Sequence, residues 1–164
     1  MGSSAGTSRL PALGLALAVA LLVTAPVAFA DERDEYVERV EPICKANTEA
    51  NSRILKGVKG QVQQEKLVPA GKRFIRASTA LGKAVTQIDG VPRPAADNAK
   101  LTKWIGYLRS EKAFLQQIGQ ALKAENKFKA QKLAVELNRN NNKANNTVIS
   151  FGFDECRIDS SRFI

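Results

Sequence analysis

The 164-residue sequence contains no histidine, two cysteines and one tryptophan, and aromatic residues make up 6% of it. The lack of histidine removes the commonest general base and metal ligand, and every nucleophile system in which histidine activates a serine or cysteine. It also excludes the histidine-containing di-iron motif of helical bundles. If both cysteines are oxidised, a zinc site would have to rest on carboxylates alone. We therefore predict no metal ion and no cofactor.

Sequence motifs for catalysis are equally scarce. The chain has no Gly-x-x-x-x-Gly-Lys loop of the kind that binds phosphates. Its adjacent acids Asp154 and Glu155 lie beside Cys156, where neighbouring carboxylates are more typical of a solvated turn than of an acid/base pair. We therefore predict that the protein is not an enzyme. A hydrolytic or redox enzyme would need this acid pair or a free thiol.

One long hydrophobic run is present, at the N-terminus. Leu, Ala and Val dominate residues 10–23, and the segment Ala28-Phe29-Ala30 follows. This order is typical of a secretory signal peptide cleaved after Ala30. An uncleaved membrane anchor is the alternative, because the run is long enough to span a bilayer, but prolines interrupt it and acids follow it. We predict a signal peptide at residues 1–30 and one domain at residues 31–164, secreted or in the cell envelope.

Cysteine occurs only at positions 44 and 156, near the two ends of the predicted domain. Two cysteines in an exported chain are typical of a disulfide, whereas redox dithiols place their cysteines close together. We predict a Cys44–Cys156 bond. Because it would close a long loop, the bond would stabilise the fold by about 4–5 kcal/mol.

Apolar residues recur at steps of three and four through most of the predicted domain, which is the period of helices that bury one face. Glycines and prolines separate four such stretches. The sequence therefore predicts an all-α fold, an antiparallel four-helix bundle in which the disulfide joins the first helix to the C-terminal segment. The four predicted helices span residues 34–58, 63–88, 95–125 and 127–150.

Helix-breaking residues predict where these helices begin, bend and end. Pro42 and Pro69 should each either kink a helix or begin its main body. Gly57 and Gly60 should end the first helix.

Aromatic residues predict parts of the core. Trp104 should fill its centre, where the indole nitrogen needs a partner, and a ligand-stacking role on the surface is the alternative. We expect Phe128 to face inward from the last helix. We also expect Phe151 and Phe153 to dock on the bundle and bring the second cysteine back to the first.

An asparagine-rich run, residues 138–146, falls in the last predicted helix. Asparagine is a poor helix former because its side chain competes for backbone hydrogen bonds. Two interpretations are open: a polar binding face in which Asn140 or Asn141 contacts a ligand, and a weak helix end that faces solvent. We favour the solvent-facing interpretation, since propensity is a weak signal that packing often overrides.

Positive charge dominates the chain, with 25 Lys and Arg against 16 Asp and Glu. Acids are concentrated in residues 31–41, whereas residues 45–112 hold fourteen bases and five acids. Outside the cytoplasm, a basic body favours an anionic envelope polymer, an anionic lipid or an acidic protein as the partner, and no nucleic acid is expected. The alternative is a solvated surface that only keeps the protein soluble.

Steps of four and seven place Lys72, Arg76 and Lys83 on one face of the second predicted helix. Such a row could bind phosphates or carboxylates, and it is equally ordinary as the wet side of an amphipathic helix. A second basic cluster near the turn between the last two helices comprises Lys123, Lys127, Lys129 and Lys132.

Three short segments, residues 40–44, 101–105 and 152–156, resemble small exported helical proteins of high-GC Gram-positive bacteria. That group has no assigned activity, so the resemblance assigns no functional residue.

From the residues, the leading hypothesis is a non-enzymatic exported module that binds an anionic envelope component or a protein partner. The alternative is a carrier that holds a small apolar ligand between kinked helices near Pro42 and Pro69.

Overall fold

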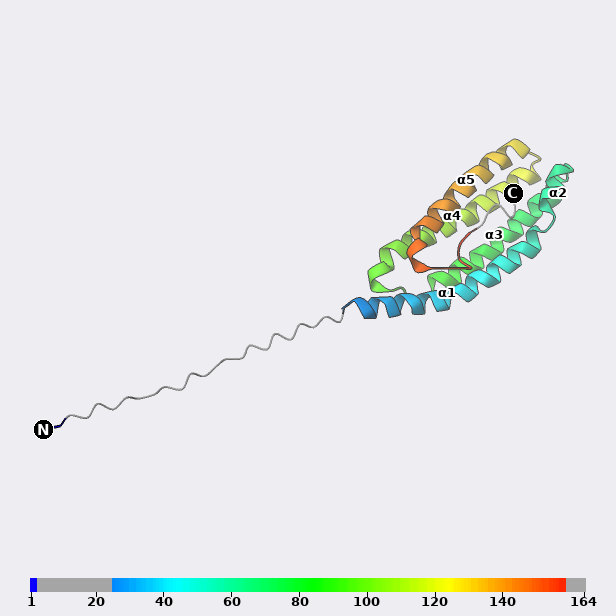
Figure 1. Cartoon of the computed structure of the whole chain (residues 1–164). Helices are drawn as coiled ribbons and strands as arrows, with labels where there is room; N and C mark the ends of the chain where they lie inside the picture. Colours follow the sequence, from blue (N-terminus) through cyan, green and yellow to red (C-terminus); the bar gives the residue numbers. More distant parts are fainter. Residues whose placement is uncertain (3–24, 159–164) are drawn as a thin grey trace.

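The computed structural model describes residues 1–2 and 25–158, with side chains from residue 31 onward in the folded part. Every regular element in this part of the chain is helical, so the predicted all-α class is confirmed (Figure 1). The long helices are α1 (Ala25–Leu55), α3 (Leu67–Asp89), α4 (Asn98–Lys123) and α5 (Lys127–Thr147). The short ones are α2 (Val58–Gln63) and the 3-10 turns η1 (Ala95–Asp97) and η2 (Ile149–Phe151).

The predicted signal peptide lies mostly outside the described residues, because residues 3–24 are not among them. Helix α1 is already formed at Ala25 and continues through the predicted cleavage bond after Ala30. Among the helices that the structure describes, none has the length and hydrophobicity to cross a membrane. The signal peptide and its cleavage stay predictions.

The first helix differs in detail from its prediction. Pro42 lies inside α1, which is continuous on both sides of it, so this proline does not begin the helix. Gly57 follows the end of α1 with a φ of 78°, a left-handed conformation that glycine adopts without strain. Gly60 lies within α2, so the prediction that it ends the first helix is wrong. Pro69 falls in the first turn of α3, as predicted for a helix start, where its missing amide hydrogen costs no helical hydrogen bond.

The long helices pack in sequence order, α1 against α3, α3 against α4, and α4 against α5 (Figure 1). Helices α3 and α4 approach each other closely at two glycines. A Cβ atom on Gly71 would lie 2.5 Å from the backbone oxygen of Gly119. Ser78, buried on the same face of α3, donates a hydrogen bond to the backbone oxygen of Lys112 at 2.9 Å. These contacts hold the backbones of α3 and α4 close together.

The C-terminal segment, the described residues 148–158 that follow α5, packs on both α1 and α5. The 3-10 turn η2 contacts both helices, and Figure 1 shows the red segment after α5 turning back toward α1. Phe151 and Phe153 are buried, as predicted, and Phe153 stacks on Trp104 with ring centroids 5.3 Å apart. Trp104 itself is 0% exposed, which confirms its predicted place in the core.

Two predictions for the last helix are wrong. Phe128, expected to face inward, is 67% exposed, because it lies in the first turn of α5, where Lys132 Nζ lies 4.5 Å from its ring centroid. Asn140 and Asn141, expected to face solvent, are buried. The amide of Asn140 donates to the backbone oxygen of Tyr107 in α4 at 2.9 Å, so its burial is compensated by a hydrogen bond.

Candidate functional sites

The predicted anion-binding residues form an exposed row on α3, which we call the basic face: Lys72, Arg76 and Lys83. Within residues 31–158, none of the three has an ion pair or a side-chain hydrogen bond. The last residue lies eleven positions after the first, so the row extends over about 16 Å of helix.

Arg73, which adjoins Lys72 of the basic face in sequence, has a structural role. Its guanidinium donates to the backbone oxygens of Ile54 at 3.3 Å and Lys56 at 2.6 Å. These carbonyls lie at the C-terminal end of α1, where helix oxygens lack partners and a positive charge is favourable. Arg73 therefore connects α3 to α1 through one of its terminal nitrogens.

A groove between α3 and α4 runs beside the basic face. The charged residues that line it are all basic: Lys83, Arg109 and Lys112. Arg109 is already paired with Asp89 at 2.7 Å. Gly82 leaves room for the aliphatic part of Lys112, since a Cβ atom there would lie 3.2 Å from Lys112 Cε. The groove thus extends the basic face with Lys112, which has no ion pair among residues 31–158, an arrangement that suits phosphate or carboxylate groups.

The second predicted basic cluster is less available. Lys127 pairs with Glu65, and Lys132 lies over the ring of Phe128. Lys123 and Lys129 are exposed. Because half of its members already have partners, this cluster is the weaker candidate for an anion.

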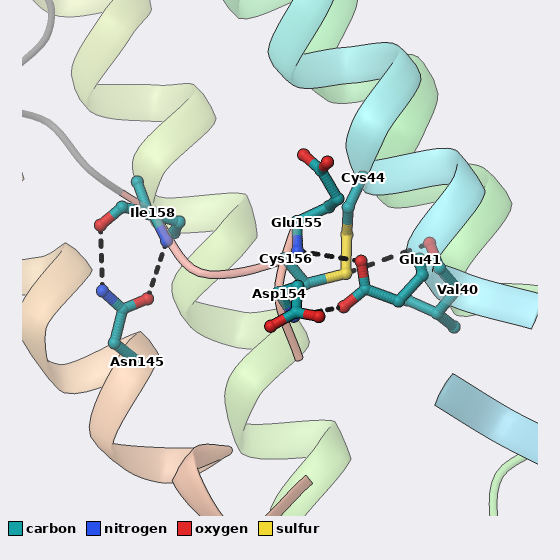
Figure 2. The surroundings of a disulfide bond; sticks show 8 residues. All are labelled: Val40, Glu41, Cys44, Asn145, Asp154, Glu155, Cys156 and Ile158. Carbon is teal, nitrogen blue, oxygen red and sulfur yellow. Dashed lines mark hydrogen bonds between the residues drawn. A yellow bond between two sulfur atoms is a disulfide. The ribbon is translucent and has the colours of Figure 1, made fainter. Parts of the chain in front are cut away.

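The predicted disulfide is present between Cys44 and Cys156, whose Cα atoms are 5.0 Å apart, so neither cysteine is a free thiol (Figure 2). Glu41, one turn before Cys44 in α1, accepts hydrogen bonds from the backbone amides of Asp154 at 2.7 Å and Glu155 at 2.8 Å. The disulfide and this carboxylate together fix the segment against α1.

The far end of the same segment is held by α5. The side chain of Asn145 both donates to the backbone oxygen of Ile158 and accepts from its backbone nitrogen, each at 2.9 Å (Figure 2). This pair of bonds gives the asparagine-rich run a structural role. The C-terminal segment is thereby connected to α1 on one side and to α5 on the other.

A small cavity of about 130 Å³ lies beside the disulfide. Helices α1, α3 and α4 and the C-terminal segment all contribute to its wall. Three lining residues have a buried polar atom without a hydrogen-bond partner: Asn51 Oδ1, Trp104 Nε1 and Glu111 Oε2. The partner predicted for the indole nitrogen is therefore not found among the described residues. Unsatisfied buried polar atoms are rare and costly, so three of them in residues that line one cavity make it a candidate site.

Burial of the Glu111 carboxyl group away from water raises its pKa to about 8. Glu111 is therefore mostly uncharged at neutral pH, and it can donate as well as accept a hydrogen bond. Trp104 offers a donor and Asn51 an acceptor. The three groups together can satisfy a neutral molecule that has both a donor and an acceptor.

The sequence analysis missed Asn51 and Glu111, although both follow a readable pattern. Glu111 occupies the step between Leu108 and Leu115 on the buried face of α4. Asn51 occupies the step between Cys44 and Leu55 on the buried face of α1. A polar residue at a position that the helical period assigns to the core is the signal that would have found them.

No protein-family model, curated protein or solved structure matches the chain. No residue role therefore comes from similarity, and the resemblance to exported helical proteins stays a prediction. The functional argument depends on the two sites described here, the basic face and the cavity.

Proposed function

We propose that the protein is an exported, non-enzymatic binding module whose basic face holds an anionic polymer of the cell envelope. One observation carries the proposal: Lys72, Arg76 and Lys83 are exposed in one row, without a partner among residues 31–158, next to a groove whose charged lining is wholly basic. The extracytoplasmic location is supported by the Cys44–Cys156 disulfide, since such bonds persist in oxidising compartments.

A polymer fits this surface better than a single small anion. The basic face is exposed, and each contact between a solvated lysine or arginine and an anion is weak. A chain with repeated phosphate or carboxylate groups can contact all three residues at once, and each neutralised charge releases condensed counterions. Binding should therefore be strong at low salt and weak at high salt.

The test is the affinity of the purified protein for long-chain polyphosphate and polyglutamate at several salt concentrations. The variant K72A/R76A/K83A removes the basic face. The control variant K45A/K103A/K143A removes three exposed lysines from α1, α4 and α5, so both variants lose the same charge. We expect the first variant to bind at least about tenfold more weakly than the control, with a shallower salt dependence.

Each other result has a definite meaning. Equal losses in the two triple variants would show that only net charge matters, and the proposal would fail. Binding to anionic lipid vesicles but to neither polymer would replace the polymer with a membrane surface. Binding to neither polymer nor vesicles at low salt would leave the charge as a solubility feature.

The alternative hypothesis, a small-ligand carrier, has one observation in its favour, the cavity beside the disulfide. Neither Pro42 nor Pro69 lines it. Three of the residues that line it, Asn51, Trp104 and Glu111, each have a buried polar atom without a partner among the described residues, which a purely apolar ligand would leave unsatisfied.

A further inference from the structure

We propose that the cavity beside the Cys44–Cys156 disulfide binds a small uncharged molecule of about the size of phenol, with an apolar body and one hydroxyl or amide group. This site is separate from the basic face, because it has none of Lys72, Arg76 and Lys83 in its wall. Its ligand class also differs, being neutral and small. The inference therefore goes beyond the proposed binding of a polyanion.

The volume of the cavity sets the size of the ligand. Its volume of about 130 Å³ is close to that of an engineered apolar cavity of about 150 Å³ that binds benzene. A molecule with one six-membered ring, or a chain of similar size, therefore fits. Larger ring systems would have to displace the C-terminal segment, which the disulfide and Glu41 hold in place.

One part of the cavity wall is apolar and suits the body of such a ligand. Leu81, Ala84 and Ile88 of α3 and Leu108 of α4 line it, together with the two cysteines of the disulfide. All four side chains belong to the buried core. Contacts with a ring or short chain would replace water against this surface, which is favourable in proportion to the apolar area covered.

The polar part of the wall determines which functional group the ligand needs. The indole N–H of Trp104 can donate, the amide oxygen of Asn51 can accept, and the carboxyl group of Glu111 can do both while it is protonated. None of these atoms has a partner in the folded chain as described, although Asn51 and Trp104 are more than nine-tenths buried. A hydroxyl or amide group would supply the missing partners without introducing a charge.

Charged ligands are disfavoured for the same reason that Glu111 is neutral. Burial alone raises the pKa of Glu111, so the site penalises an anion at this place. Two lining residues from the C-terminal segment, Asp154 and Arg157, are exposed to solvent. The cavity therefore reaches the surface along this segment, which gives a small neutral molecule a route in.

The chain has a built-in reporter for this site. Trp104 is the only tryptophan, so the ¹H–¹⁵N spectrum of the purified protein contains one indole N–H resonance. The probes are phenol and toluene, which have nearly the same shape and differ by a hydroxyl in place of a methyl group. We expect phenol to shift the resonance in a saturable way. Toluene should bind with an affinity at least about tenfold lower, because a buried hydrogen-bonding site rejects an analogue that lacks the polar group.

Variants separate the polar and apolar contributions. Glu111→Leu should lower the affinity for phenol by about tenfold or more and raise the affinity for toluene. Glu111→Gln keeps a donor and an acceptor, so it should retain phenol binding. Ala84→Val should fill the cavity and abolish binding of both probes. Lys103→Ala is the control, because this exposed residue adjoins Trp104 in sequence but lies outside the cavity wall. It should bind phenol as the unchanged protein does.

Three results would overturn the proposal. No saturable shift with either probe would mean that the cavity holds water only. Equal affinity for phenol and toluene, unaffected by Glu111→Leu, would mean that the polar atoms select nothing. A phenol shift that persists in a folded Ala84→Val protein would place the binding elsewhere; a thermal melt followed by circular dichroism shows that this variant is folded.

Discussion

Two contact regions of this molecule, α3 with α4 and α1 with the C-terminal segment, are held together by different means. Between α3 and α4 the backbones touch at Gly71 and Gly119, and Ser78 uses its hydroxyl to bond the opposite helix. Between α1 and the C-terminal segment, a covalent bond and the Glu41 carboxylate hold the chain, yet a cavity with unsatisfied polar atoms remains. At the two glycines, the close approach of the backbones leaves no space for even one added side-chain atom. A covalent connection supplies stability without filling the space beside it, so a binding site can persist there.

Among the changes that test this comparison, loss of the disulfide should lower the stability of the protein most. The double variant C44A/C156A should lower the free energy of unfolding by about 4–5 kcal/mol, because the bond closes a loop of over a hundred residues in the unfolded chain. Urea unfolding followed by circular dichroism measures the change. A reducing agent should destabilise the unchanged protein similarly and leave the double variant unaffected. A loss below about 1 kcal/mol would show that the hydrogen bonds to Glu41 and Asn145 hold the segment without the covalent bond.

The buried acid of the cavity should make stability depend on pH. The folded chain, with the pKa of Glu111 at about 8, keeps a proton that the unfolded chain releases above about pH 4.5. Stability therefore falls as the pH rises from 4.5 to 8, by up to about 4 kcal/mol, and then levels off. Glu111→Gln should remove this slope, whereas Glu38→Gln, at an exposed position of α1, should keep it. Parallel pH profiles for unchanged and Glu111→Gln proteins would contradict the assignment.

The close contact between α3 and α4 should tolerate no added side-chain atom. Gly71→Ala should destabilise the protein by about 1–3 kcal/mol, because its Cβ atom would overlap the backbone of α4. Gly106→Ala is the matched control, since a Cβ atom on this helical glycine meets nothing within 4 Å. It should raise stability by about 0.5–1 kcal/mol through higher helix propensity. Thermal unfolding of both variants makes the comparison, and similar shifts in both would rule out a close approach of α3 and α4.

The smallest expected effect concerns the asparagine-rich run. Asn140→Ala should cost about 1 kcal/mol, because it removes the hydrogen bond to the backbone oxygen of Tyr107. Asn142→Ala, two positions along and exposed, should change the free energy of unfolding by less than about 0.5 kcal/mol. Denaturant unfolding distinguishes them. If the two substitutions cost the same, the run would be a solvent-facing helix end as first interpreted.

Helical periodicity was a reliable guide to the elements and to most of the core. The steps of three and four predicted all four long helices, and the predicted export together with the cysteine spacing predicted the disulfide. Trp104, Phe151 and Phe153 were placed correctly because large aromatic residues near apolar stripes have few alternatives to burial. Phe128 was misplaced because one turn at a helix end can extend beyond the core that the rest of the helix covers.

The candidate cavity was beyond the sequence for a different reason. Its wall combines residues from three helices and the C-terminal segment, and no local pattern predicts which of their polar atoms lack a partner. Glu111 and Asn51 interrupt apolar stripes, which marks them as unusual. Whether such a residue is satisfied, however, depends on contacts between segments far apart in the chain. The basic face was predictable because its residues share a single helix.

The indole N–H resonance of Trp104 tests the two-site account most directly, in one protein sample titrated first with polyphosphate and then with phenol. The account predicts that polyphosphate binds without moving this resonance, because the basic face has no residue in the cavity wall, and that phenol then shifts it with unchanged affinity. A shift on addition of polyphosphate, or competition between the two, would contradict the separation of a basic outer face from a neutral cavity beside the disulfide.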